Sequence, residues 1–220
     1  MTAAVGLSRR TEIMDRAAAL FAEQGVAVTS MADIAAAVGI RKASLYHFYP
    51  SKGELLMEVL RPVVQQPYVE LNAIVDGPGT VRDRFIEGMA ALGRAFEQQG
   101  QRMQVLVRER LERHLSPAGF EEIRGWKWAY TELWHALVRE GVETGVFRPT
   151  PDTITVFGLL GSLNWMYAWF DPEGQLRGEE VGRELAALFL TGLLADGGPD
   201  GSAGNTTVAD TAGDTDDVSR

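Results

Sequence analysis

Two helix-stopping residues, Gly39 and Pro50, stand close together and leave room between them for a turn and one short helix. Before Gly39, apolar residues recur at the spacing of one buried helical face. After Pro50, Ser51 and Glu54 form the ends of a capping box, which begins another helix. Two short helices joined by a tight turn that contains glycine are typical of a helix-turn-helix. The sequence therefore predicts this motif near the N-terminus.

The charge of this region differs from that of the whole chain. The net charge of the 220 residues is −9, yet no carboxylate lies between residues 34 and 53. Three cations there, Arg41, Lys42 and Lys52, are interleaved with aromatic and hydroxyl side chains. Residues 1–52 carry six Lys or Arg against four Asp or Glu, so the acidic total comes from the rest of the chain. A local cationic face of this kind indicates binding to a polyanion.

Apolar spacing and capping residues predict helices along most of the chain, and no stretch alternates as a β-strand would. The fold class is therefore all-α, with about nine helices. Pro62 and Pro67 are expected to kink or end the fourth helix. The predicted helices cover residues 8–24, 31–38, 42–49, 52–73, 80–99, 103–116, 120–143, 152–170 and 179–194.

Charge and composition divide the chain into three parts. Residues 1–52 are expected to form a helix-turn-helix DNA-binding domain. Residues 53–195 are expected to form a ligand-binding and dimerisation domain, in which residues 53–75 make the connecting helix. Residues 196–220 carry one Arg against six Asp and hardly any large apolar side chain, so they cannot bury enough surface to order themselves. We interpret them as a disordered acidic tail.

Composition excludes several classes of protein. The absence of cysteine excludes disulfides, thiolate nucleophiles and cysteine metal sites, and the N-terminus lacks the apolar core of a signal peptide. Residues 153–170 carry no charge and approach the length of a membrane span, but they contain Gly158, Gly161 and Asn164, and no basic cluster flanks them. A helix buried inside the protein explains this segment better. We expect a cytoplasmic protein that does not bind membranes.

A set of residues at fixed spacing covers about a quarter of the chain: Ala18, Phe21, Gly25, Thr29-Ser30, Asp33-Ile34-Ala35, Val38-Gly39-Ile40, Ser44-Leu45-Tyr46, Tyr49-Pro50-Ser51-Lys52 and Leu55-Leu56. This set resembles the DNA-binding domain of the TetR/AcrR family of transcriptional regulators. Arg41, where the family usually has a small capping residue, and Tyr49, where it usually has phenylalanine, are small departures. The resemblance implies a homodimer that binds double-stranded operator DNA and a small-molecule effector.

The resemblance and the chemistry of the residues assign the same roles in this region. The third helix is expected to enter the major groove. Arg41 and Lys42 suit guanine O6 and N7, while Ala43 and Ser44 permit close approach and contact with a thymine methyl. The alternative for Arg41 is a solvated surface charge, and Tyr49 is expected to pack against the first helix. The side chains expected to reach phosphates are Thr29, Ser30, Tyr46, His47 and Lys52, with packing as the alternative for Tyr46.

The second domain resembles the same family more weakly. The pattern from Glu140 to Asp152 and the charge-free residues 153–170 resemble the family's last helices, where two subunits form a four-helix interface. Operator symmetry also requires a dimer, because half-sites lie about 34 Å apart. Residues 169–174 resemble a subgroup that includes regulators of lipid and steroid catabolism, which implies an acyl-CoA or other lipid-like effector. The expected interface residues are Phe157, Leu160, Asn164, Leu185, Leu188 and Phe189.

All five tryptophans lie in two segments of the second domain, and this density indicates a ligand pocket. Plain core packing is the alternative, because aromatic residues at helical spacing are usually buried. Arg108 could meet an anionic ligand, but it could equally pair with a neighbouring glutamate such as Glu109 or Glu112. The expected ligand-binding residues are Arg108, Trp126, Tyr130, Trp134, Trp165 and Trp169.

A catalytic function has no residues to support it. Glu132 and His135 have the spacing of a helical metal half-site, but a di-metal bundle needs a second copy and further carboxylates. No nucleophile-elbow, phosphate-binding or dinucleotide motif occurs. We expect no enzyme activity, metal or cofactor, and interpret the chain as a repressor that a small molecule releases from its operator. The alternative is a helical small-molecule-binding or catalytic protein with an incidental helix-turn-helix.

Overall fold

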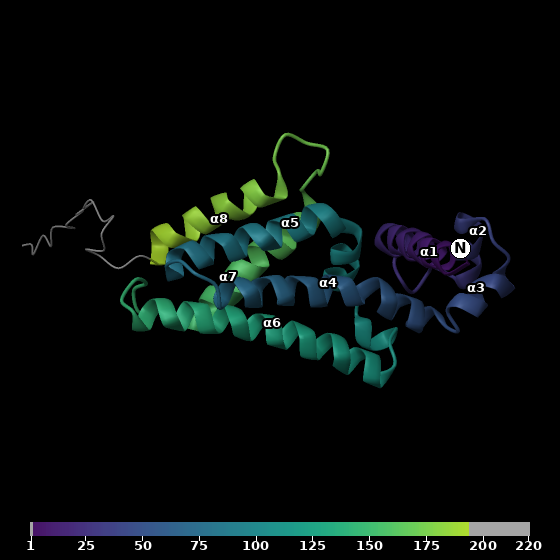
Figure 1. The fold of residues 1–220 in the computed structure, drawn as a ribbon, viewed down its shortest axis with the longest axis horizontal. Helices are drawn as coiled ribbons and strands as arrows, with labels where there is room; N and C mark the ends of the chain where they lie inside the picture. Colours follow the sequence, from purple (N-terminus) through teal and green to yellow (C-terminus); the bar gives the residue numbers. More distant parts are fainter. Residues whose placement is uncertain (1, 194–220) are drawn as a thin grey trace, which may run out of the picture.

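The computed structural model describes residues 2–193, with side chains from residue 9 onward. Within this part of the chain there are eight α-helices and two short 3-10 helices, and no β-strand, which confirms the all-α class. The predicted tail, residues 196–220, lies outside the described residues. Three helices gather at one end of the molecule, and the longer helices of the second domain extend away from them (Figure 1).

The N-terminal domain consists of α1 (Thr2–Gln24), α2 (Met31–Val38) and α3 (Lys42–Phe48). α1 begins six residues earlier than its predicted start at Ser8. Ser30 caps α2 in a capping box, in which its side chain accepts the Asp33 N–H while Asp33 accepts the Ser30 N–H. Gly39 ends α2 with φ at 71°, a left-handed conformation that glycine adopts without strain. The core between these helices includes the buried side chains of Phe21, Ile34 and Leu45.

The connecting helix α4 (Lys52–Val75) begins at the N-cap Ser51 and runs on into the second domain (Figure 1). Of the two outcomes expected at Pro62 and Pro67, a kink or an end of the helix, the end is not found, because α4 continues through both prolines to Val75. Each proline removes one helical hydrogen bond. One face of α4 nevertheless buries a row of apolar side chains from Leu55 to Leu71, and this packing holds the helix together despite the prolines.

The helix α5 (Val81–Arg108) joins two segments that the sequence predicts as separate helices. Gln99 has non-helical backbone angles, φ −133° and ψ 29°, so the expected break next to Gly100 is present as a kink inside one element. This kink explains why eight helices are found where about nine are expected. A short 3-10 helix, η1 (Leu111–Arg113), follows α5.

The remaining helices are α6 (Pro117–Glu143), α7 (Asp152–Asn164) and α8 (Gly178–Leu193), with the 3-10 helix η2 (Trp165–Ala168) after α7. The charge-free segment therefore ends as an α-helix at Asn164, earlier than predicted. α4 packs between α5 and α6, and α5 packs between α4 and α8 (Figure 1). The core of this domain includes Phe85, whose ring lies edge-on to Trp134 at 5.8 Å and to Phe147 at 5.7 Å between centroids.

Glycines allow α5 and α8 to cross closely. A Cβ atom at Gly93 would overlap the carbonyl oxygen of Gly178, and one at Gly182 would overlap that of Met89. No larger residue fits at this crossing without separating the two helices.

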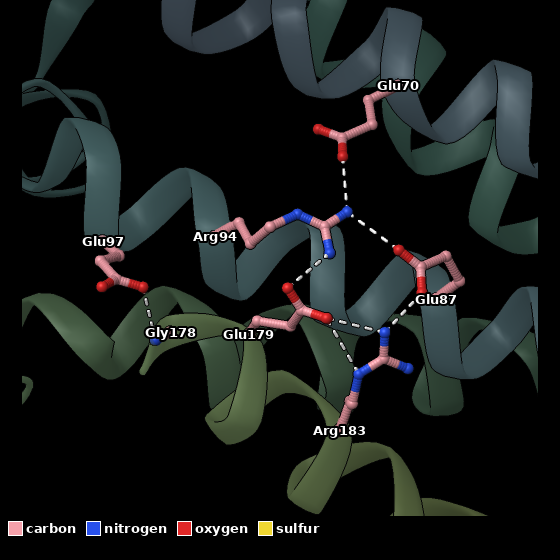
Figure 2. A network of polar contacts seen from close by, with 7 residues as sticks. All are labelled: Glu70, Glu87, Arg94, Glu97, Gly178, Glu179 and Arg183. Atoms are coloured by element: carbon pink, nitrogen blue, oxygen red, sulfur yellow. Dashed lines mark hydrogen bonds and ion pairs between the residues drawn. The ribbon is translucent and has the colours of Figure 1, made fainter. Parts of the chain in front are cut away.

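Charged side chains surround this crossing (Figure 2). Arg94 of α5 donates to Glu70 of α4 at 2.7 Å and to Glu87 at 2.9 Å, and lies 3.2 Å from Glu179 of α8. Arg183 of α8 donates to both Glu87 and Glu179 at 2.8 Å. Hydrogen bonds from Arg183 and Arg94 lower the pKa of the Glu179 carboxyl group. The network ties three helices together around the glycine contact.

Candidate DNA-reading surface and effector cavity

The beginning of α3 presents a row of exposed side chains, Arg41, Lys42, Ala43 and Ser44, which we name the DNA-reading surface. Arg41 is the N-cap of α3, and its side chain makes no capping hydrogen bond. Leu45 is fully buried and anchors α3 against the core of the domain. The burial of one face of α3 leaves the cationic and small side chains of the opposite face accessible to a ligand as large as a DNA groove.

Three more of the predicted DNA contacts are exposed beside this surface. Tyr46 is 42% exposed, and the Lys42 ammonium group lies 5.9 Å from the centre of its ring. His47 is exposed on the last turn of α3, and Ser30 is exposed at the start of α2. Ser30, Tyr46 and His47 are therefore accessible to a phosphate group, as the predicted contacts require.

Lys52 has a different role from the predicted phosphate contact. Its half-buried ammonium group donates to the carbonyl oxygens of Val26 at 2.6 Å, Thr29 at 2.9 Å and Ala27 at 3.3 Å. An ammonium group has three donors, and Lys52 directs all of them into the turn between α1 and α2. The lysine therefore fastens the start of α4 to this turn, which we name the Gly25–Thr29 turn.

The predicted phosphate contact of Thr29 was also wrong. The side chain is completely buried, and its hydroxyl group donates to the Gly25 carbonyl oxygen at 2.8 Å. The Thr29 backbone N–H points to the same oxygen at 3.3 Å. Both donors of Thr29 are thus used inside the turn, and the residue stabilises the domain from within.

Tyr49 packs as the sequence predicts. Its ring is buried in the core, and the guanidinium group of Arg10 from α1 lies 5.1 Å from the ring centre. Burial raises the pKa of the Tyr49 hydroxyl group, while the Arg10 charge opposes that shift. The contact joins the end of α3 to α1 and keeps the angle between these helices fixed.

The second domain holds a small apolar cavity of about 90 Å³ among α4, α5, α6 and α7, which we name the inner cavity. It brings together two of the predicted ligand residues, Trp126 and Tyr130. Both come from α6, and burial raises the pKa of the Tyr130 hydroxyl group. The full lining comprises Val63, Val64, Pro67, Leu92, Met103, Leu106, Trp126, Lys127, Tyr130, Thr131, Leu160 and Asn164.

Four of the predicted ligand residues do not line the inner cavity. Trp134 is fully buried against Phe85 and belongs to the core. Trp165 and Trp169 are 60% and 50% exposed. Arg108 is exposed and lies over the ring of Tyr167, at 5.9 Å from its centre. The tryptophan density thus reflects three different environments, of which one is a cavity.

Several cavity residues were missed by sequence reasoning. Val63, Val64 and Leu92 lie on apolar helix faces that are indistinguishable in sequence from ordinary core. Leu160 and Asn164, which are predicted to form the dimer interface, line the inner cavity. The absence of charge from residues 153–170 was the available signal, because a helical segment without charges has to bury one face against its own domain.

The outer faces of α7 and α8 carry large exposed apolar side chains. Ile154, Phe157 and Leu188 are 72%, 61% and 70% exposed, and Leu185 and Phe189 are half-buried beside them. We name these five residues the α7–α8 face. Exposed apolar surface that is gathered in one place usually marks an interaction site.

Metal and membrane sites find no support in the described part of the chain. No group of three or more His, Cys, Asp or Glu side chains there could hold a metal ion. His135, from the Glu132–His135 spacing, is buried, and its Nδ1 atom lies 3.2 Å from an Asp152 carboxylate oxygen. Among residues 2–193, no helix has the length and apolar character needed to cross a membrane.

Two family models match the chain. The model described as "Bacterial regulatory proteins, tetR family" matches residues 13–59, a range that contains the DNA-reading surface. The model described as "Tetracyclin repressor-like, C-terminal domain" matches residues 78–193, a range that contains the α7–α8 face. The two models together account for most of the chain.

Known relatives agree with these models. The HTH-type transcriptional repressor KstR2 of Mycobacterium tuberculosis is 31% identical over 191 residues, 86% of this chain and 95% of that protein. The crystal structure of PfmR from Thermus thermophilus is 32% identical with a TM-score of 0.74, over 81% and 97% of the two chains. AibR, solved with isovaleryl coenzyme A and operator DNA, shares the fold at 24% identity with a TM-score of 0.71, over 82% and 97%. The chain therefore belongs to the TetR family of DNA-binding transcriptional regulators.

Proposed function

We propose that the protein acts as a non-catalytic homodimer, which a lipid-like effector in the inner cavity releases from operator DNA. The observation that carries this proposal is the position of α4. We name residues 1–52 the DNA-reading domain. Lys52, the first residue of α4, hydrogen-bonds the Gly25–Thr29 turn of this domain, and farther along the same helix Val63, Val64 and Pro67 form a wall of the inner cavity. Because its partner is operator DNA, the proposed place of action is the cytoplasm.

The proposed division of labour on DNA follows the exposure of the residues. The DNA-reading surface contacts base edges, where Arg41 and Lys42 donate to guanine. Ser30, Tyr46 and His47 contact phosphates, which fix the position of the domain without reading sequence. We place the boundary between residues 52 and 53, so that Lys52, the first residue of α4, belongs to the DNA-reading domain and the rest of α4 belongs to the ligand-binding domain.

Dimerisation is proposed to cover the α7–α8 face. Phe157 and Leu188 would lose most of their exposed apolar area in a helix–helix interface between two copies, which is the main favourable term in association. A two-fold dimer presents two DNA-reading domains, as a palindromic operator requires. The interface proposed here excludes Leu160 and Asn164, because both face the inner cavity.

The size of the inner cavity suggests how an effector changes the protein. Ligand cavities usually hold about 300–1,000 Å³, whereas the inner cavity holds about 90 Å³. A ligand of that usual size fits only if the surrounding helices move apart. Such a ligand binds the expanded conformation more tightly than the compact one, and this difference in affinity is what shifts the population away from DNA binding.

The lining of the inner cavity suggests an apolar effector with an anionic or carbonyl end. Apolar and aromatic side chains dominate the lining, and Lys127 is the one charged side chain among the described residues that form it. The relatives point the same way, because AibR is solved with isovaleryl coenzyme A and a structural relative, 28% identical, is described as a ketosteroid regulator. We therefore propose an acyl-CoA or a related lipid thioester as the effector class.

Thermal unfolding with isovaleryl-CoA, palmitoyl-CoA and free coenzyme A tests this proposal. An acyl-CoA that binds the native state stabilises it by RT ln(1 + L/Kd), where L is the ligand concentration, so the melting temperature rises with the logarithm of L once this exceeds Kd, and free coenzyme A raises it less. The same acyl-CoA should release a bound operator fragment. Leu160→Trp fills the inner cavity and should abolish both effects, whereas Leu176→Trp, the same change at an exposed loop position, should preserve them.

Two results would contradict the proposal for the effector. One is stabilisation by free coenzyme A equal to that by the acyl-CoAs, which would place recognition outside an apolar cavity. The other is an acyl-CoA response that Leu160→Trp leaves unchanged. Neither result would affect operator binding itself, which is measured without effector.

A further inference from the structure

The last part of α5, residues 100–108, and the C-cap Glu109 touch the DNA-reading domain at three points. Arg102 pairs with Asp15 of α1 at 2.5 Å, and Gln104 donates to the carbonyl oxygen of Ala22 at 3.2 Å. Glu109 accepts the backbone N–H of Val26 at 3.3 Å, inside the Gly25–Thr29 turn. All three contacts come from the chain after the kink at Gln99, which sets this segment apart from the rest of α5.

The opposite face of the same segment lines the inner cavity. Met103 and Leu106 are three residues apart, so they lie on one face of the helix, and both belong to the cavity lining. Arg102 and Gln104 flank Met103 in sequence and point to α1. Expansion of the inner cavity would push against Met103 and Leu106, and the short helical segment would carry that displacement to its contacts with the DNA-reading domain.

The Gly25–Thr29 turn is held from two sides. Lys52 of α4 binds its carbonyl oxygens, and Glu109 at the end of α5 binds its Val26 N–H, so the two faces of one turn are fixed by two different helices. Gly25 has φ at 90°, and a Cβ atom there would lie 3.3 Å from the Glu109 carboxylate. Glycine thus serves both the backbone conformation and the close approach of Glu109. The turn leads directly into α2, which positions α3.

The second carboxylate oxygen of Glu109 is also engaged. It lies 3.5 Å from His114 Nε2, just beyond η1. The chain at His114 packs on the start of α4, because a Cβ atom at Gly53 would lie 3.0 Å from the His114 carbonyl oxygen. The Glu109 side chain is therefore held between the end of α5, the start of α4 and the Gly25–Thr29 turn.

We propose that Glu109 is a positioning residue for operator reading, and that the effector signal reaches the DNA-reading domain through it. Glu109 holds the Gly25–Thr29 turn in the register that orients α2 and α3, and displacement of residues 100–108 by an occupant of the inner cavity withdraws it. This inference rests on the proposed function, because it names the route by which the inner cavity acts on DNA.

Hydrogen exchange and operator affinity of three variants test the inference without any effector. Glu109→Ala removes the acceptor, Glu109→Gln keeps an acceptor oxygen, and Glu112→Ala removes a carboxylate from an exposed position of the adjacent η1. In Glu109→Ala the Val26 amide should exchange about tenfold faster and operator affinity should fall about tenfold, as expected for loss of a hydrogen bond to a charged acceptor. Glu109→Gln should have a Val26 exchange rate and an operator affinity close to those of the parent protein, and Glu112→Ala should match the parent in both.

Operator DNA supplies the test of the route. Coupling between two sites is reciprocal, so binding of the operator fragment should change exchange across residues 103–109 in the parent and in Glu109→Gln, and much less in Glu109→Ala, where only the contacts of Arg102 and Gln104 remain. The inference is overturned if Glu109→Ala leaves Val26 exchange and operator affinity unchanged, or if operator binding alters exchange at residues 103–109 in that variant as strongly as in the parent. Failure of the parent to bind any operator would refute the proposed function instead, while Val26 exchange would still report on the Glu109 contact.

Discussion

Removal of the Lys52 ammonium group distinguishes between two roles for this residue, which are stabilisation of the Gly25–Thr29 turn and contact with a DNA phosphate. Lys52→Met keeps the aliphatic part of the side chain and removes three hydrogen bonds, two of them to the carbonyl oxygens of the buried residues Val26 and Thr29. Because water replaces part of what is lost, these two bonds contribute about 1–1.5 kcal/mol each. We therefore expect the free energy of unfolding of the DNA-reading domain to fall by about 2–3 kcal/mol.

Urea denaturation at fixed protein concentration measures this loss, and Lys42→Met serves as the matched control, because Lys42 is exposed and should change stability by less than about 0.5 kcal/mol. Salt titration of DNA binding completes the test. A lysine that contacts a phosphate changes the slope of log affinity against log salt by about 0.9. Lys52→Met should leave this slope unchanged. If Lys52→Met reduces the slope of log affinity against log salt by about 0.9 per subunit and leaves the free energy of unfolding unchanged, Lys52 contacts a phosphate and does not brace the turn.

Three further predictions concern other parts of the structure. Gly182→Ala should destabilise the protein by about 1–3 kcal/mol in thermal unfolding, because the added methyl group overlaps the Met89 carbonyl oxygen; an unchanged melting temperature would contradict the close crossing of α5 and α8. Leu188→Glu should convert the dimer to a monomer of about 24 kDa in sedimentation, since a charge on the α7–α8 face cannot be buried there; persistence of the dimer would place the interface elsewhere. Hydrogen bonds from Ser30 hold the pKa of Asp33 below its ordinary value of 3.8, so the stabilisation by this carboxylate is present above that pH and is lost as the pH falls through the lowered pKa. Asp33→Asn should therefore speed hydrogen exchange in α2 at pH 7, and this effect should shrink as the pH falls below 3.8; an effect that does not change with pH would contradict the charged capping role.

Local sequence rules predicted the helix ends in the DNA-reading domain well. α2 begins after the N-cap Ser30 and ends at Gly39, as the sequence predicts for a helix over residues 31–38, because capping depends on residues within one turn of each other. The burial of Tyr49 was predictable for a similar reason, since it follows from the amphipathic pattern of a short helix. The same rules left open whether Pro62 and Pro67 kink or end α4, and the helix continues because packing against other helices outweighs local propensity.

The roles of Lys52 and Thr29 could not be read from the sequence. A lysine at a helix N-terminus and a threonine before a helix are both suited to bind phosphate, and only the position of the Gly25–Thr29 turn decides otherwise. Its carbonyl oxygens come within reach of Lys52 through tertiary packing, between residues more than twenty positions apart. The chemistry of each donor was predictable, but its acceptor was not.

The inner cavity shows a similar limit. Trp126, Tyr130 and Trp134 follow one another at helical spacing on α6, and the sequence treats them alike. The ring of Phe85 fills the space beside Trp134, whereas the space beside Trp126 and Tyr130 is left open between α4 and α5. Whether an aromatic side chain lines a cavity or a core depends on the volume of its neighbours from other helices, which no local pattern contains.

The central claim, that α3 reads a specific operator, is tested most directly by fluorescence anisotropy with DNA from the region flanking the protein's own coding sequence. At about 150 mM salt, the account predicts binding to one fragment at least about 10³-fold tighter than to random DNA of the same length. Lys42→Ala should narrow this ratio by weakening the specific complex more than the random one. Equal affinity for flanking and random DNA in the parent protein, with no change in the ratio for Lys42→Ala, would contradict the account.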